Sequence, residues 1–105
     1  MNRVAKGNRV ELMLRKILEA DGYLVDKKNR TKWQSPDLFG VFDLVAIKES
    51  RVRFIQVKSN RSHFYIARKE ISHFLKLHNL NIEAEIWLYQ GKGKWRSESL
   101  SPDSY

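Results

Sequence analysis

The chain contains no cysteine among its 105 residues. Disulfide bonds, thiolate metal sites and cysteine nucleophiles are therefore excluded. Long apolar runs are also missing, since no segment approaches the length that is needed to cross a membrane. The first residues, Met1-Asn2-Arg3, lack the apolar core of a secretion signal. We therefore expect a cytoplasmic protein.

Acidic residues are scarce relative to basic ones. Twenty Lys and Arg stand against twelve Asp and Glu, which gives a formal net charge of +8 and a pI near 9.9. A compact domain with this excess attracts polyanions, and phosphate backbones are the commonest of these inside cells. We expect the protein to bind nucleic acid. The alternative is a basic protein whose charge only keeps it in solution.

Breaks in the chain are few, because it has only two prolines and five glycines. Repeats, low-complexity blocks and internal linkers are absent from the sequence. A hydrophobic content of 42% over 105 residues is enough for one core. We expect a single domain over residues 1–105, with residues 99–105 as a frayed polar tail.

The spacing of apolar residues predicts an α/β fold. Residues 8–21 and 67–78 have apolar side chains at helical spacing, so they are predicted helices. Predicted strands cover residues 23–25, 41–47, 52–58, 82–90 and about 94–97, and residues 27–39 are a predicted loop. The resulting order, α-β-β-β-α-β with a further strand, predicts a mixed central sheet flanked by helices.

Three polar residues interrupt the two central strands. Asp43 lies in an otherwise apolar strand, where a carboxylate is costly unless it is paired or coordinated to a metal. Gln56 and Lys58 are two residues apart and so project from one face of their strand. Folding the hairpin about Glu49 and Ser50 places Asp43 opposite Gln56, unless a bulge shifts the register. Opposed residues have Cβ atoms roughly 4.5–5.5 Å apart, so all three should converge on one patch.

Such a patch suits metal-assisted hydrolysis of a phosphodiester. A carboxylate and an amide oxygen are hard ligands of the kind that Mg²⁺ takes. A nearby lysine can orient or deprotonate the attacking water and offset the charge of the phosphate. The alternative is a buried ion pair between Asp43 and Lys58 that only fixes the register.

Glu11 is the candidate for a third oxygen ligand. On a helical wheel it borders the apolar stripe beside Leu18, whereas Glu19 lies on the opposite, solvated face. A glutamate at that edge could reach over the sheet. The alternative is an ordinary helix glutamate that is favoured by the positive end of the helix dipole.

Glu11, Asp43 in Phe42-Asp43-Leu44-Val45-Ala46-Ile47, and the run Gln56-Val57-Lys58-Ser59 together resemble the PD-(D/E)xK nuclease superfamily. The similarity is greatest to the archaeal and phage Holliday junction resolvases, and it covers roughly residues 7–90. It implies a restriction-endonuclease-like core in which these residues bind Mg²⁺ or Mn²⁺ and cut DNA. It also implies a homodimer that acts on four-way junctions, because a junction needs two matched cuts.

One position departs from the pattern of that superfamily. Its third acidic residue is Gln56 here, as in some restriction-type members, so the site has one negative charge fewer and should hold a metal more weakly. A non-catalytic DNA-binding module with a degraded site therefore stays an alternative, as does a nickase or restriction-like nuclease. Asp37, in Pro36-Asp37, is expected to be a loop residue or a secondary ligand.

Basic residues that flank these motifs are the candidate contacts to DNA phosphates. They are Arg3, Lys6 and Arg9 at the first helix, Lys27, Lys28, Arg30 and Lys32 on the long loop, and Arg61 after the motif strand. Trp33 and Ser35 on that loop are candidates for positioning DNA near the metal, as mobile-loop residues do in the resolvases that the chain resembles. For each of these residues alone, a solvated surface role is the alternative.

Overall fold

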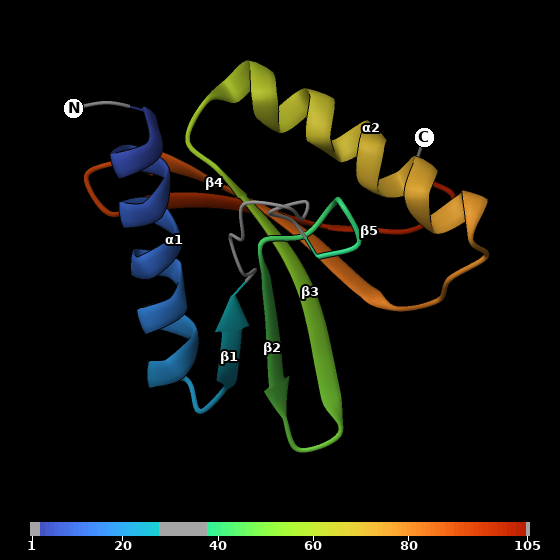
Figure 1. Ribbon diagram of the computed structural model, residues 1–105, viewed down its shortest axis with the longest axis horizontal. Helices are drawn as coiled ribbons and strands as arrows, with labels where there is room; N and C mark the ends of the chain where they lie inside the picture. The colour runs from blue at the N-terminus through green and yellow to red at the C-terminus, as the bar shows by residue number, and fades with distance from the viewer. Residues whose placement is uncertain (1–2, 28–37, 105) are drawn as a thin grey trace, which may run out of the picture.

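The computed structural model describes residues 3–27 and 38–104, with side chains from residue 7 onward in the first helix (Figure 1). The elements of these residues follow in the order α1 (Arg3–Ala20), β1 (Leu24–Lys27), β2 (Leu44–Lys48), β3 (Arg51–Lys58), α2 (Arg61–Leu77), β4 (Glu83–Gly91) and β5 (Lys94–Leu100). The predicted order is confirmed, including the further strand. No helix in this part of the chain is long and apolar enough to cross a membrane.

The strands form one mixed sheet in the order β1-β2-β3-β4-β5. Every neighbouring pair is antiparallel except β3 and β4, which are parallel and are joined through α2. A parallel pair needs such a crossover, because a short turn cannot return the chain to the same end of the sheet. The predicted mixed α/β sheet is therefore confirmed.

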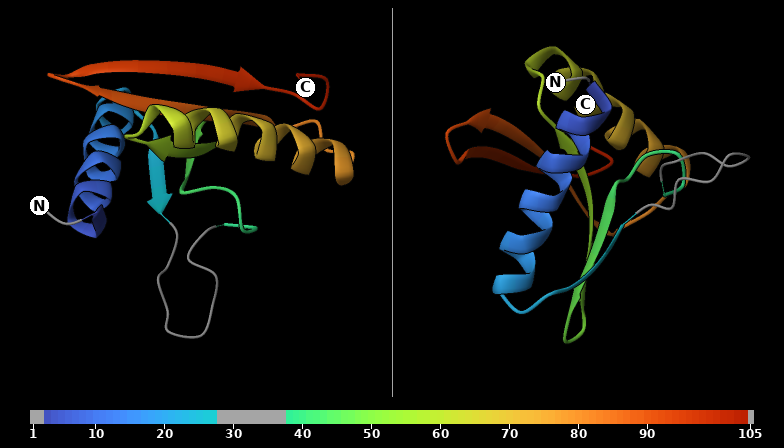
Figure 2. Two further views of the ribbon diagram at one scale, coloured as in Figure 1. Left: turned by 90° about the horizontal axis from the view of Figure 1, so that it is seen from above. Right: turned by 60° about the vertical axis from the view of Figure 1, so that its left-hand side comes forward.

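Each helix buries its apolar face on a different side of the sheet. Helix α1 runs beside β1, and α2 runs beside β4 (Figures 1 and 2). Alternation along β3 separates the two cores, since Ile55 and Val57 pack with α1 whereas Phe54 packs with α2. The α1 core contains Val10, Leu14, Leu18, Leu44 and Ala46, and the α2 core contains Phe42, Phe64, Ala67, Ile71, Leu75, Ala84, Ile86 and Leu88.

Both helices begin earlier than the apolar pattern predicts. Helix α1 begins at Arg3 instead of residue 8, and α2 begins at Arg61 instead of residue 67. The start of α2 is set by Asn60, whose Oδ1 accepts hydrogen bonds from the backbone N–H groups of Ser62 and His63 at 2.9 and 3.2 Å. Such a cap satisfies donors that the first turn leaves without partners. The spacing of apolar residues does not reveal this polar cap, so it does not predict where α2 begins.

The hairpin of β2 and β3 has the predicted register, from Lys48 opposite Arg51 to Leu44 opposite Ile55. However, β2 begins at Leu44 and not at residue 41. The backbone N–H groups of Val41 and Phe42 both donate to the carbonyl of Leu38, at 3.0 and 2.9 Å, so residues 38–42 form a turn. The start that we predicted for this strand was therefore wrong.

The prediction of a frayed tail from residue 99 was also wrong at its beginning. Ser99 and Leu100 belong to β5 and pair with Glu85 and Ala84 of β4. The side chain of Leu100 is buried in the α2 core, which holds this end of the strand in place. Beyond it, the Ser101 N–H donates to Ser104 Oγ at 2.9 Å, so the chain continues as a turn.

A buried ion pair connects the two parallel strands. Arg53 Nε donates to Glu85 Oε2 at 2.6 Å, and the two side chains are only 11% and 8% exposed. The hydrogen bond to Glu85 raises the pKa of Arg53. Trp87 Nε1 also donates to Glu85 at 3.1 Å, and the Arg53 guanidinium lies 5.0 Å from the centroid of the Tyr23 ring. The charges of the pair are thus surrounded by further polar and aromatic partners.

We predict that Glu85→Gln destabilises the protein by roughly 3 kcal/mol, because the buried Arg53 charge loses its anionic partner. Urea unfolding at neutral pH measures this loss. Glu83→Gln is the matched control, since it breaks a pair with Arg51 in which both side chains are exposed. Its unfolding midpoint should move much less. Equal losses in the two variants would contradict a special role for the buried pair.

Candidate functional site

Asp43 lies where β2 separates from β3. Its backbone N–H donates to the Ile55 carbonyl at 2.8 Å, and its Oδ2 accepts from the Val57 N–H at 2.7 Å. The carboxylate thus accepts a hydrogen bond from the Val57 backbone beyond the last regular pair of β2 and β3. Because the Asp43 side chain is buried, this charge-assisted bond compensates part of its desolvation.

The structure links Asp43 to the motif strand by another route than the predicted pairing with Gln56. Regular pairing ends at Leu44 opposite Ile55, so Asp43 and Gln56 do not form a ladder pair. The Asp43 backbone instead bonds to Ile55, and its carboxylate reaches Val57, the residue between Gln56 and Lys58. Asp43 directly precedes β2, so its side chain, and not strand pairing, links it to the motif.

Gln56 carries a buried oxygen atom that has no partner among the described residues. Its residue is 5% exposed, and Oε1 accepts no hydrogen bond from the part of the chain that the structure describes. Alternation along β3 places it on the face opposite Val57 and α1. A buried acceptor without a donor is destabilising, so such an atom in a native protein calls for a water or an ion.

Lys58 and Glu11 occupy different positions relative to this oxygen. Lys58 is half-buried at the end of β3 and shares the face of Gln56. Glu11 is half-buried on α1, next to Val10, and α1 packs on the other face of the sheet. None of the contacts described above joins Glu11 to Asp43, Gln56 or Lys58. The convergence of all four side chains therefore stays a prediction.

The donor set fits a weakly held divalent cation. Across residues 3–27 and 38–104, no three His, Cys, Asp or Glu side chains form a group that could hold a metal ion. The predicted set has only two such residues, Glu11 and Asp43, and the amide of Gln56 as its third ligand. Carboxylate and amide oxygens are ligands that Mg²⁺ takes, and the free Oε1 of Gln56 offers a coordination position.

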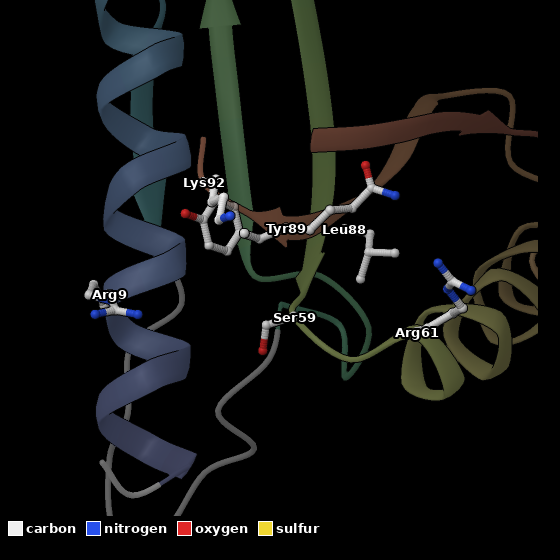
Figure 3. Close-up of a pocket in the computed structure, with 8 residues that line it drawn as sticks. Arg9, Ser59, Arg61, Leu88, Tyr89 and Lys92 are labelled. Carbon is white, nitrogen blue, oxygen red and sulfur yellow. The ribbon is translucent and has the colours of Figure 1, made fainter. Parts of the chain in front are cut away.

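A basic cavity of about 480 Å³ opens at the carboxyl ends of the parallel strands β3 and β4 (Figure 3). Three cationic residues line it, and they come from α1, from the start of α2 and from the turn between β4 and β5. The complete lining is Arg9, Ser59, Arg61, Leu88, Tyr89, Gln90, Gly91 and Lys92. Two predicted phosphate contacts, Arg9 and Arg61, are thus brought to one cavity.

The other predicted DNA contacts are not brought together by the described residues. Lys27 is exposed at the end of β1. Arg3 and Lys6 belong to α1, but their side chains are not described. The loop candidates lie outside the described residues: Lys28, Arg30, Lys32, Trp33, Ser35 and Asp37.

Sequence reasoning missed Lys92 as a site residue. The predicted strands over residues 82–90 and about 94–97 leave Gly91-Lys92-Gly93 between them, with no role in a site. The signal that could have found it is the strand–helix–strand order of β3, α2 and β4, because such a crossover favours parallel pairing. Parallel strands end at the same edge of a sheet. Lys92, after β4, is therefore expected at the same edge as Arg61, after β3.

Comparison with known proteins gives a similarity of fold. No family model and no curated protein matches the chain. Among solved structures, it is similar to Hjc of Archaeoglobus fulgidus, a Holliday junction resolvase from an archaeal hyperthermophile. The similarity has a TM-score of 0.59 at 20% identity, and it covers 90% of this chain and 72% of that one. The two chains share a fold, which confirms the predicted fold class.

Removing the Asp43 side chain should destabilise the protein even without metal. We predict a loss of about 1–3 kcal/mol for Asp43→Ala, because the Val57 N–H is left without its acceptor. Asp43→Asn keeps an amide oxygen in the same place and should retain most of the stability. Urea unfolding in the presence of a chelator measures both variants. If Asp43→Asn loses as much as Asp43→Ala, then the negative charge matters more than the hydrogen bond.

Proposed function

We propose that the protein is a metal-dependent endodeoxyribonuclease that acts on four-way DNA junctions. The observation that carries this proposal is the buried Asp43 carboxylate bonded to the N–H of Val57, the residue after Gln56, whose buried Oε1 has no described partner, in a fold similar to that of a resolvase. The net charge of +8 and the cavity lined by Arg9, Arg61 and Lys92 support DNA as the substrate.

The residues of the motif would divide the chemistry among them. Asp43 and Gln56, with Glu11, would hold Mg²⁺ or Mn²⁺. The bound ion supplies Lewis-acid stabilisation of the phosphate and lowers the pKa of the attacking water. Lys58, on the same face as Gln56, orients that water and offsets negative charge as it develops on the phosphate. Asp43 is held in position by its bond to the Val57 N–H.

The junction substrate implies a homodimer. A four-way junction has two symmetric strands to cut, so two copies of the site must act together, and a two-fold dimer provides them. The similar protein from Archaeoglobus fulgidus is a Holliday junction resolvase, which supports this choice of substrate.

One observation favours a second candidate function. Gln56 stands where the resembling nucleases have an acid, so the site lacks one negative charge for a metal. A non-catalytic DNA-binding module would keep the basic surface and lose the chemistry. A nickase or restriction-like enzyme would keep the chemistry and differ in its substrate.

Cleavage and binding of a labelled four-way junction separate these candidates. We predict that the protein cuts the junction symmetrically in Mg²⁺ or Mn²⁺, leaves the matching linear duplex largely intact, and has the mass of a dimer in solution. Asp43→Asn should bind the junction at least as well as the parent, since a carboxylate that repels phosphate is gone. It should cut orders of magnitude more slowly, because the metal loses its anchor.

The alternatives predict other results in the same assays. Equal cutting of junction and duplex would indicate a nuclease without junction preference. Tight binding with no cleavage in either metal would indicate the non-catalytic module. An Asp43→Asn variant that is folded, bound and fully active would end the case for this site.

Metal binding can be tested at Gln56 without any assay of activity. In Gln56→Glu, burial and the nearby Asp43 carboxylate should raise the pKa of the new carboxyl. The folded state then favours the protonated form, so the variant should be less stable than the parent at neutral pH and recover as the pH falls. A bound cation would reverse the loss, by about 2.7 kcal/mol when Mg²⁺ is at 100 times its dissociation constant.

Melting curves with Mg²⁺ and with chelator provide the measurement. The melting temperature of Gln56→Glu should rise with Mg²⁺ by more than that of the parent. Gln56→Met is the matched control, since it keeps the length of the side chain and removes the ligand oxygen, and its melting temperature should respond least. Three identical responses would show that no cation binds at this position.

A further inference from the structure

The turn between β4 and β5 contains a lysine in an unfavourable backbone conformation. Gly91 pairs with Lys94, so Lys92 and Gly93 are the two central residues of a tight hairpin turn. Both have positive φ, 53° and 73°. Hairpin turns with positive φ at both central residues favour Asn, Asp or Gly at the first of them, because a long side chain is sterically disfavoured there. Lys92 thus stands where Asn, Asp or Gly is favoured, as Glu49 does in the turn between β2 and β3.

The turn is held in place by the aromatic side chains behind it. Tyr89 Oη accepts a hydrogen bond from the Gly93 N–H at 3.2 Å. The Tyr89 ring lies 5.0 Å from the ring of Trp95, which lies 5.9 Å from that of Trp87, centroid to centroid. Lys92 therefore projects from a supported turn, so its ammonium group is brought to the cavity with little freedom of the backbone to lose on binding.

Like charges gather in this cavity without an acid among them. Arg9, Arg61 and Lys92 line it, and the lining residues that the structure describes include no carboxylate (Figure 3). Arg61 is the first residue of α2, so the positive end of that helix dipole adds to the same potential. Ser59 and Gln90 contribute neutral hydrogen-bonding groups. Repulsion among these three cations raises the free energy of the free protein, and a bound anion relieves that repulsion.

We propose that this cavity binds a phosphate of the DNA backbone, with Lys92 as an anchoring residue, and that the turn between β4 and β5 is a DNA-contacting element. The inference rests on DNA as the substrate of the proposed function. Ser59 of the cavity directly follows Lys58 of the motif, so the anchored phosphate lies next to the one to be cut. The contact would set where the strand enters the site.

Lys92→Asn tests the anchor without harming the turn. Asparagine is favoured at this turn position, so the variant should fold at least as stably as the parent while it loses the cation. Affinity for a fluorescently labelled four-way junction, measured by anisotropy without divalent metal, should fall several-fold. The slope of log affinity against log salt should also become shallower by about 0.9, the value for one lost phosphate contact.

Two further variants separate a specific contact from general charge. Lys94→Asn removes the same charge from the exposed start of β5, outside the cavity, and should change affinity and slope by less than half as much. Lys92→Arg keeps the charge and should keep the affinity. If Lys92→Asn and Lys94→Asn weaken binding equally, or if Lys92→Asn binds like the parent, the anchor is wrong.

These outcomes are distinct from those of the nuclease proposal. If Lys92→Asn shows the predicted loss of affinity but the protein never cuts DNA, the phosphate anchor is supported and the nuclease proposal is contradicted. If the protein cuts junctions but Lys92→Asn retains the parent's affinity and salt slope, the nuclease proposal is supported and the phosphate anchor is contradicted. Binding of the junction that is absent, or that is insensitive to salt, would overturn both.

Discussion

The parallel contact between β3 and β4 determines where the functional side chains lie. Two ion pairs cross it, one buried between Arg53 and Glu85 and one exposed between Arg51 and Glu83. In the backbone register Arg53 lies opposite Glu83, so its side chain reaches two residues further along β4 to Glu85. A slip of one residue would put this charged set on the wrong face, and the register is therefore strongly specified. The ends of both strands, with Lys58 and Lys92, then share one edge of the sheet.

Three departures from local rules of stability lie near that edge. Asp43 is a buried charge that is compensated by a backbone N–H, and the nearby Gln56 has a buried oxygen without a described donor. Lys92 occupies a conformation that suits asparagine or glycine. Each departure costs stability, and proteins tend to retain such costs where function requires them. That three of them occur near the carboxyl ends of two adjacent strands supports one extended site.

The exchange of an acid for Gln56 has a consistent electrostatic meaning. An amide keeps an oxygen ligand but removes a negative charge, which weakens the attraction for a cation and reduces repulsion of phosphate. Under the proposed function, a chain of net charge +8 would therefore hold metal less tightly and DNA more tightly than it would with an acid at this position. A shared fold alone does not decide between these uses, because function depends on the site that the fold carries.

Local and periodic features were accessible from the sequence. Alternation predicted the strands, and the turn at Glu49 and Ser50 predicted the hairpin register, because pairing next to a short turn is set by counting. Tertiary structure determined the features that counting residues along the chain could not predict. It began β2 only at Leu44 and turned the Asp43 carboxylate to Val57, and it aligned β4 parallel to β3, so that Lys92 lines one cavity with Arg9 and Arg61. These contacts join residues far apart in the chain, and the free energy that selects them comes from packing of the whole sheet against two helices.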